Sequence, residues 1–159
     1  MKNFKQYLRQ SIQQKLNENT QSNMEMAASM VHDAWMSRNP KAEWNAAQHV
    51  PYEELPEAEK QKDRDHINMI KDITAEHGLD TTNAEHHDAI INHFGSAAHE
   101  EWRMGFEAKN GEGTPRMKKT SDGGETNINV PWKDLHPEWK KDNIAAGKAA
   151  IAAYNQYMI

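Results

Sequence analysis

Two histidines have the type and setting that acid–base chemistry requires. His32 is followed directly by an acidic residue and, three positions on, by Trp35. The same arrangement recurs at His99 and Trp102. A histidine near a carboxylate can act as a general base where a cleft brings a substrate within hydrogen-bond reach. Because the arrangement occurs twice in one chain, we favour a structural interpretation in which each histidine fixes a turn against its tryptophan. Catalysis by either histidine is the least favoured function.

Metal and carboxylate chemistry have weaker support. His86 and His93 share a helix face, but a zinc site needs three or four ligands, and no third one is indicated. The paired acids lie in alternating-charge helical segments, where solvated ion pairs are the ordinary explanation; they are Glu53/Glu54, Asp63/Asp65 and Glu100/Glu101. The chain has no cysteine, which excludes disulfides and thiolate chemistry. We therefore expect neither a metal nor a cofactor.

The best ligand-binding candidate is the Gly- and Lys-rich segment 109–124. Its three cations are Arg116, Lys118 and Lys119, and four glycines lie around them. Mobile backbone amides beside cations suit an anionic ligand. Tyr52 and Trp132 offer stacking faces for such a ligand, or else they are core aromatics. The other interpretation of the segment is a solvated insertion without a partner.

Composition and charge bound the class of protein. The 159 residues are 36% apolar, so we expect a modest core, and the net charge is −5. Residues 1–18 sum to +3, which leaves −8 for the rest. An acidic body argues against binding to duplex nucleic acid. No apolar run is long enough to span a membrane, and no secretion signal is present, so we expect a cytoplasmic protein.

The first 23 residues predict a helix followed by a linker. Apolar residues recur at helical spacing through residues 1–18, at Met1, Phe4, Leu8, Ile12 and Leu16. The polar stretch 19–23 is interpreted as a linker. A capping box, Ser22 with Glu25, then predicts the start of the next helix.

The remaining segments predict a mainly α fold. Pro40 ends the second helix, and residues 41–55 are expected to be irregular or extended. Pro56 begins a helix that Gly78 ends, and a capping box at Thr82 begins another. Segment 109–124 is a long loop or a hairpin, and Pro137 begins the last helix.

Two constant offsets in residue number divide the chain into similar halves. The first, which we call the histidine offset, takes His32 to His99 and Trp35 to Trp102. The second, the turn offset, relates two copies of a Val-Pro-aromatic turn followed by leucine. The turn residues are Pro51, Tyr52 and Leu55 in the first copy and Pro131, Trp132 and Leu135 in the second. An internal repeat of this kind indicates one supersecondary unit used twice.

The repeated residues resemble the RyR domain, the repeat of ryanodine receptors. The stretch "VPYEELPEAEKQKDRDHINMIKDI" is similar to the pattern of that family, and "VPWKDLHPEWKKDNIAAGKAA" to a divergent second copy. The resemblance implies a helical domain over 24–159, in which motif one (about 24–78) and motif two (about 82–157) pair about a pseudo-twofold with short strands. We expect Asp63 and Arg64 to join the two halves. A Gly-Trp…Tyr-Gly stretch of the family is replaced here by "KAEWNAAQH".

The N-terminus is similar to the peptides that direct internal proteins into tailed-phage heads. Such peptides are removed after a Leu/Ile-x-Glu sequence, which here ends at Glu18. The alternative is a terminal helix that packs on the domain or on another copy. Together the resemblances imply a non-enzymatic phage binding module that acts in the infected host or is packaged in the virion head. Its expected ligand is a small anionic nucleotide related to ADP-ribose. The alternative function is a structural protein that contacts phage head or assembly proteins.

Overall fold

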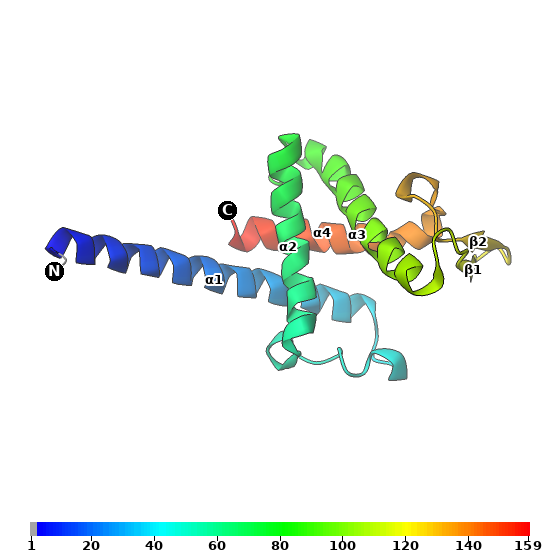
Figure 1. Cartoon of the computed structure of the whole chain (residues 1–159), viewed down its shortest axis with the longest axis horizontal. Helices are drawn as coiled ribbons and strands as arrows, with labels where there is room; N and C mark the ends of the chain where they lie inside the picture. Colours follow the sequence, from blue (N-terminus) through cyan, green and yellow to red (C-terminus); the bar gives the residue numbers. More distant parts are fainter. Residues whose placement is uncertain (1–2) are drawn as a thin grey trace. The chain divides into compact units, whose positions relative to one another are not determined.

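Four α-helices dominate the described part of the chain, which is mainly α as the sequence predicts. The computed structural model describes residues 3–159, so Met1 of the predicted apolar stripe lies outside the described residues. The helices are α1 (Phe4–Arg38), α2 (Glu57–His77), α3 (His87–Asn110) and α4 (Pro137–Tyr157), joined by short 3-10 turns and one hairpin (Figure 1).

The chain divides into two compact units. Unit 1 comprises Met1–Asn68 together with Ala152–Ile159, and unit 2 comprises Met69–Ile151. The fully buried core residues of unit 1 include Ala27, Ala28 and Ile67, and those of unit 2 include Ile70, Ile90 and Phe94.

Helix α1 runs unbroken through the predicted linker at 19–23, which is therefore a wrong prediction (Figure 1). This stretch contains no proline or glycine, so its polar residues lower helix propensity without ending the helix. The Thr20 hydroxyl donates to the Leu16 carbonyl at 2.9 Å, a local bond that keeps the hydroxyl satisfied inside the helix. The predicted cap at Ser22 does not form, because the helix begins at Phe4, where Asn3 is the N-cap and makes a capping box with Gln6.

The α1 helix ends where the sequence predicts, at Arg38. The Asn39 side chain and backbone both donate to the Trp35 carbonyl, and Pro40 prevents a further turn. Two 3-10 turns, Glu43–Asn45 and Tyr52–Glu54, follow in the segment expected to be irregular or extended.

The start of α3 also differs from the prediction. Asn83, not Thr82, caps this region by accepting from the Glu85 amide, and Asp80 accepts from both the amide and the hydroxyl of Thr82. The short Asp and Asn side chains form local turns here, which leaves the threonine hydroxyl as a donor to Asp80.

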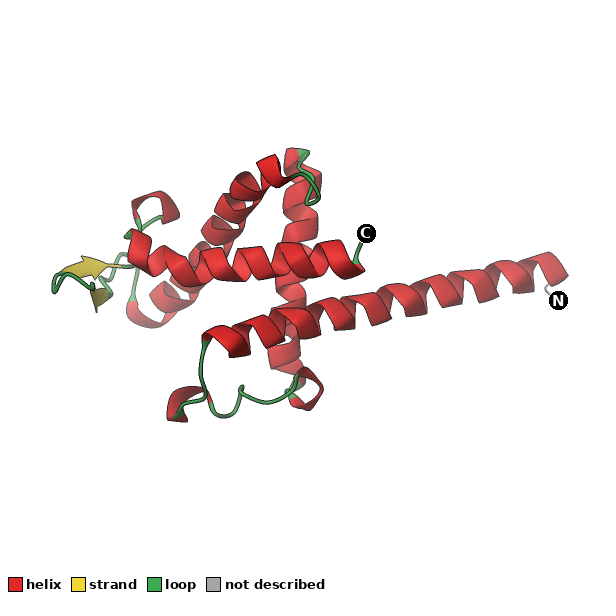
Figure 2. Ribbon diagram, turned by 180° about the vertical axis from the view of Figure 1, so that it is seen from behind, coloured by secondary structure: helices red, strands yellow, loops and turns green. Residues whose placement is uncertain are grey.

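The Gly- and Lys-rich segment forms the hairpin alternative. Strand β1 (Met117–Lys119) pairs antiparallel with β2 (Glu125–Asn127), with Lys118 opposite Thr126 (Figure 2). Gly123 has φ 87° in the connecting turn, a backbone conformation that favours glycine.

Candidate functional site

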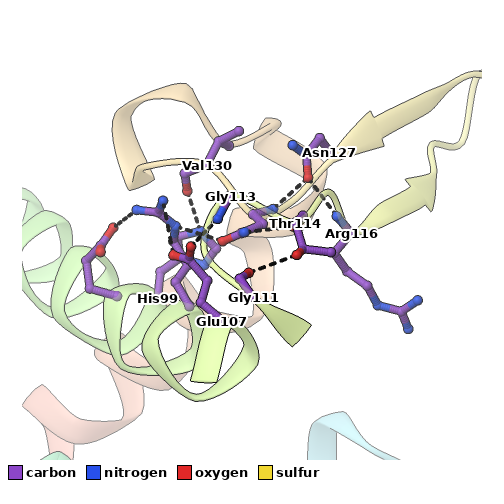
Figure 3. Close-up of polar contacts among 11 residues, drawn as sticks. His99, Glu107, Gly111, Gly113, Thr114, Arg116, Asn127 and Val130 are labelled. Atoms are coloured by element: carbon purple, nitrogen blue, oxygen red, sulfur yellow. Dashed lines mark hydrogen bonds and ion pairs between the residues drawn. The ribbon is translucent and has the colours of Figure 1, made fainter. Parts of the chain in front are cut away.

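Each histidine of the repeat holds the turn of its own motif. His99 Nε2 lies 2.8 Å from the Val130 carbonyl oxygen (Figure 3), and in motif one His32 Nε2 lies 2.7 Å from that of Val50. Because a carbonyl only accepts, Nε2 carries the proton in both rings. Both side chains are buried, as their role inside the motif requires.

The ring geometry is also reproduced. His32 stacks on Trp35 at 5.8 Å and 16°, and His99 stacks on Trp102 at 5.6 Å and 15°. The turn aromatic is tilted against the same histidine in each motif, at 6.5 Å and 55° for Tyr52. The corresponding values for Trp132 are 6.2 Å and 54°.

Two further pairs of equivalent residues complete the contact set, and sequence reasoning missed both. Lys60 places its ammonium 5.5 Å from the centre of the Tyr52 ring, and Lys140, its counterpart by the turn offset, lies 5.0 Å from that of Trp132. The Tyr52 hydroxyl donates to Glu25 at 2.8 Å. The Trp132 indole donates to Asn92 at 2.9 Å, and Asn92 is the counterpart of Glu25 by the histidine offset. Extending the two offsets along the sequence would have found these pairs.

The residue beneath the turn aromatic changes size with the ring. Ala28 packs on Tyr52 in motif one. Its equivalent, Gly95, lies so close to Trp132 that a Cβ atom there would overlap the indole. The larger ring thus occupies the space of a methyl group.

The motifs differ in charge around this shared frame. In motif one Arg64 bonds Glu25 at 2.6 Å and Glu57 at 2.5 Å. The bond from Arg64 is the main cause that lowers the pKa of each carboxyl, and the two carboxylates raise the pKa of the guanidinium. Burial is the main cause that raises the pKa of Tyr52, with the Glu25 bond second. The equivalents of Glu25 and Arg64 are Asn92 and Ile144, so motif two is neutral at these positions.

Asp63 lies beside the histidine of motif one. Its carboxylate is 3.6 Å from His32 Nδ1, and burial raises the pKa of Asp63 to about 6, against the opposing effect of His32. The equivalent residue of motif two is Asn143, which carries no charge. Asp63 and Arg64 both make these contacts inside unit 1.

An open pocket of about 310 Å³ adjoins the charged cluster of motif one. We call it the motif-one pocket; its lining residues are Ser22, Glu25, Met26, Ser29, Tyr52, Glu53, Lys60 and Tyr157. Lys60 is half-buried, and Glu53 is exposed. The pocket therefore combines a cation, carboxylates, hydroxyls and a thioether, a mixture that suits a small polar ligand.

Three backbone amides of segment 109–124 are bonded to carboxylates of the chain itself. The Glu107 carboxylate accepts from the Gly113 amide (Figure 3), and Glu138 accepts from the Ser121 amide at 2.9 Å. Asp122 accepts from the Gly124 amide at 2.9 Å. Carboxylates thus occupy the positions that an anionic ligand would take.

The three cations of this segment do not converge. Arg116 points away from the contacts around it (Figure 3). Lys118 lies over the Trp139 ring at 5.5 Å, and Lys119, its neighbour in the strand, faces the opposite side of the hairpin. Tyr52 and Trp132, the proposed stacking residues, are both buried in the turns of their motifs, as core aromatics are.

The histidines considered for metal binding have other contacts. His86 Nδ1 accepts from the Asp80 amide at 2.9 Å, and His93 stacks on His77 with ring centres 3.8 Å apart. Within residues 3–159 no three His, Asp or Glu side chains are grouped so that they could hold a metal ion. Over the same range, no helix has the length and apolar character needed to cross a membrane.

Helix α1 carries an extension that motif two lacks. By the histidine offset, the first residue of α3, His87, corresponds to Thr20. Residues 4–19, here called the N-terminal arm, therefore have no counterpart, and all of them are exposed. In Figures 1 and 2 the arm runs on past the other elements of its own unit.

Comparison with known proteins gives no relative: no family model matches the chain, and no curated protein or solved structure does.

Proposed function

We propose that this chain is a non-enzymatic binding module built from two RyR-type motifs. The support is that the residues carrying the resemblance make one contact set, and make it twice. A histidine bonds the Val-Pro turn, a tryptophan stacks on that histidine, and a lysine covers the turn aromatic. Contacts this closely reproduced are what a duplicated supersecondary unit would keep.

The engagement of both histidines argues against a catalytic role. Their Nε2 atoms donate to backbone carbonyls, and only 3% of His32 and 5% of His99 is exposed. A general base needs a free lone pair within reach of its substrate. These histidines offer none on the Nε2 side.

The ligand we propose is a phosphorylated nucleotide of the ADP-ribose type, held in the motif-one pocket. One observation carries this choice: the two motifs share their frame, but motif one keeps the charged cluster of Glu25 and Arg64 beside a pocket. Lys60 would bind a phosphate, and the Glu53 carboxylate would accept from ribose hydroxyls. Segment 109–124 is a poorer site because three of its amides are bonded to Glu107, Asp122 and Glu138.

A thermal-shift titration of the full chain with ADP-ribose, ADP and AMP tests this proposal. A ligand at a hundred times its Kd stabilises the fold by about 2.7 kcal/mol, a shift of several degrees. Lys60→Met should abolish the shift, whereas Lys140→Met, which removes the equivalent ammonium from motif two, should retain it. No shift with any nucleotide, or equal loss in both variants, would contradict the proposed site.

A second candidate function is an internal virion protein that acts through protein contacts. The observation in its favour is the N-terminal arm, which is exposed and absent from motif two. Removal after Glu18 would leave a chain starting at Asn19, immediately before the position that corresponds to the start of α3. Processing there would spare all the motif-one contacts described above.

Intact-mass spectrometry of the protein recovered from virions tests this second function. The expected mass is that of residues 19–159, and a Glu18→Ala chain should keep its full length. Absence of the protein from virions, or an unprocessed chain inside them, would count against the head-targeting role.

A further inference from the structure

The N-terminal arm carries an apolar face that no other described residue covers. Phe4 is 79% exposed, and Leu8, Ile12 and Leu16 are each about half exposed. These residues follow one another at intervals of four, so each is turned by about 40° from the last and together they form a single continuous ridge. Tyr7, 55% exposed, extends the face beside Phe4.

We infer that the arm of one molecule packs antiparallel against the arm of a second copy through this ridge. Rows of side chains spaced by four residues fit into the matching grooves of another helix, which is the commonest mode of helix packing in globular proteins. The ridge is therefore complementary to itself. This inference goes beyond nucleotide binding and does not depend on it.

Charge decides the direction of the two arms. Lys5 and Arg9 give the first half of the arm a charge of +2, whereas Lys15 and Glu18 cancel in the second half. A parallel pair would set the two positive halves side by side. An antiparallel pair sets each positive half against a neutral one, and the helix dipoles are then opposed, which is also favourable.

The polar face of the arm disfavours a lipid surface as the partner. Helices that lie in a membrane interface carry Lys and Arg along their polar face. The side of the arm opposite the ridge is uncharged; its residues are Gln6, Gln10, Gln13, Gln14 and Asn17. The cations Lys5, Arg9 and Lys15 lie beside the ridge instead. Gln13 and Gln14 also bond along the helix, to Asn17 and Glu18, as side chains of a solvent-facing surface do.

The area available is enough for a specific contact. Five large side chains on each of two arms, contributing roughly 100 Å² apiece, would remove about 1,000 Å² from water, the lower bound for a specific interface. The residues are Phe4, Tyr7, Leu8, Ile12 and Leu16. The dimer should consequently be weak and dependent on concentration.

Sedimentation velocity of the full chain from about 1 to 200 µM tests the inference, because this range spans weak to moderate dimer affinities. The expected result is a rise from monomer to dimer. Leu8→Asp should keep the protein monomeric throughout, whereas Gln10→Asp, on the opposite side of the arm, should leave the association unchanged. A monomer at every concentration, or equal effects of the two variants, overturns the inference.

Cross-linking reports the direction of the arms. Because the chain has no cysteine, single variants Lys5→Cys and Lys15→Cys can be mixed and joined by a short bis-maleimide. Antiparallel arms should give mainly links between residue 5 of one molecule and residue 15 of the other. A predominance of 5–5 and 15–15 links would overturn the antiparallel arrangement. Co-sedimentation of a monomeric chain with anionic vesicles, lost in Leu8→Asp, would assign the ridge to a lipid surface instead.

Discussion

Gly95 lies against the indole of Trp132, and the space between them leaves no room for a Cβ atom. At the equivalent place in motif one, Ala28 packs on the smaller ring of Tyr52. The two motifs have therefore exchanged volume between a helix residue and a turn aromatic while keeping the same hydrogen-bonded frame.

This relationship predicts that Gly95→Ala destabilises the protein, although alanine favours a helix more than glycine does. The added methyl group should displace the indole and lower the free energy of unfolding by about 1–3 kcal/mol. Urea unfolding measures the change. In a Trp132→Tyr background, where the ring matches that of motif one, the same substitution should cost much less. Additive losses in the double variant would contradict the exchange of volume.

The burial of Asp63 predicts that its ionisation lowers the free energy of unfolding by an amount that depends on pH. Its folded pKa of about 6 exceeds the ordinary 3.8, so the folded state prefers the protonated acid. The penalty is absent below pH 3.8 and complete above about pH 6, where it is on the order of 3 kcal/mol. Asp63→Asn, which copies Asn143 of motif two, should therefore stabilise the protein at pH 8 and have little effect at pH 3.5. A stability gain that does not vary with pH would refute this assignment.

The charged cluster of motif one stabilises the protein at neutral pH, so substituting Arg64 should destabilise it there, whereas substituting Asp63 should stabilise it. Arg64→Ile leaves the Glu25 carboxylate without its cation and should cost about 1–2 kcal/mol at pH 7, a modest figure because Glu25 is partly exposed. Arg64 lowers the folded pKa of Glu25, so this stabilisation is present above pH 4.5 and is lost as the pH falls through the folded pKa. The cost of Arg64→Ile should shrink accordingly in thermal melts at pH 3.

A matched control exists in the chain itself. Glu25→Gln combined with Arg64→Ile reproduces the uncharged character of Asn92 and Ile144 in motif two. Removing both charges should recover much of the stability lost in the single variant, because the remaining partner of Arg64, the Glu57 carboxylate, is exposed and stays solvated without a cation. A double variant no more stable than Arg64→Ile alone would show that the guanidinium acts through packing.

The turn at residues 111–114, which precedes strand β1, should respond locally to the loss of the Glu107 carboxylate. Glu107→Gln weakens the acceptor of the Gly113 amide and should speed hydrogen exchange across residues 111–114 without changing that of α2. Arg116→Ala, which removes an exposed side chain, should leave exchange and stability within about 0.5 kcal/mol of the parent. Equal acceleration in both variants would mean that Glu107 does not hold the loop.

The repeat could be predicted from sequence because it rests on residue identity at fixed offsets. The histidines, the tryptophans and the Val-Pro turns retain their types, and the structure gives them matching contacts. The histidine offset relates Ala28 to Gly95, but it does not show that either residue packs against the turn aromatic. The sequence therefore could not predict that the helix residue becomes smaller where the turn aromatic becomes larger. That difference follows from the size of a ring that lies far away in the sequence.

The predicted linker failed for a different reason. Polar residues at 19–23 are typical of loops, but no residue there prevents helical backbone, and the Thr20 hydroxyl bonds within the helix. Cations at 116–119 suggested a site because the sequence does not show where side chains point. Strand alternation places Lys118 and Lys119 on opposite sides of the hairpin. The Gly113 and Ser121 amides already donate to neighbouring carboxylates.

Because α1 is unbroken, the rotation of the arm about the helix axis is fixed relative to the part of α1 that belongs to motif one. A linker at 19–23 would let the arm turn freely, whereas a continuous helix fixes the direction of the Phe4–Leu16 ridge relative to His32 and Trp35. One inserted residue would rotate the ridge by about 100°, while seven would restore it to within about 20°. A partner that binds the arm would therefore also fix the rotational orientation of the His32 and Trp35 side chains, because they belong to the same continuous helix.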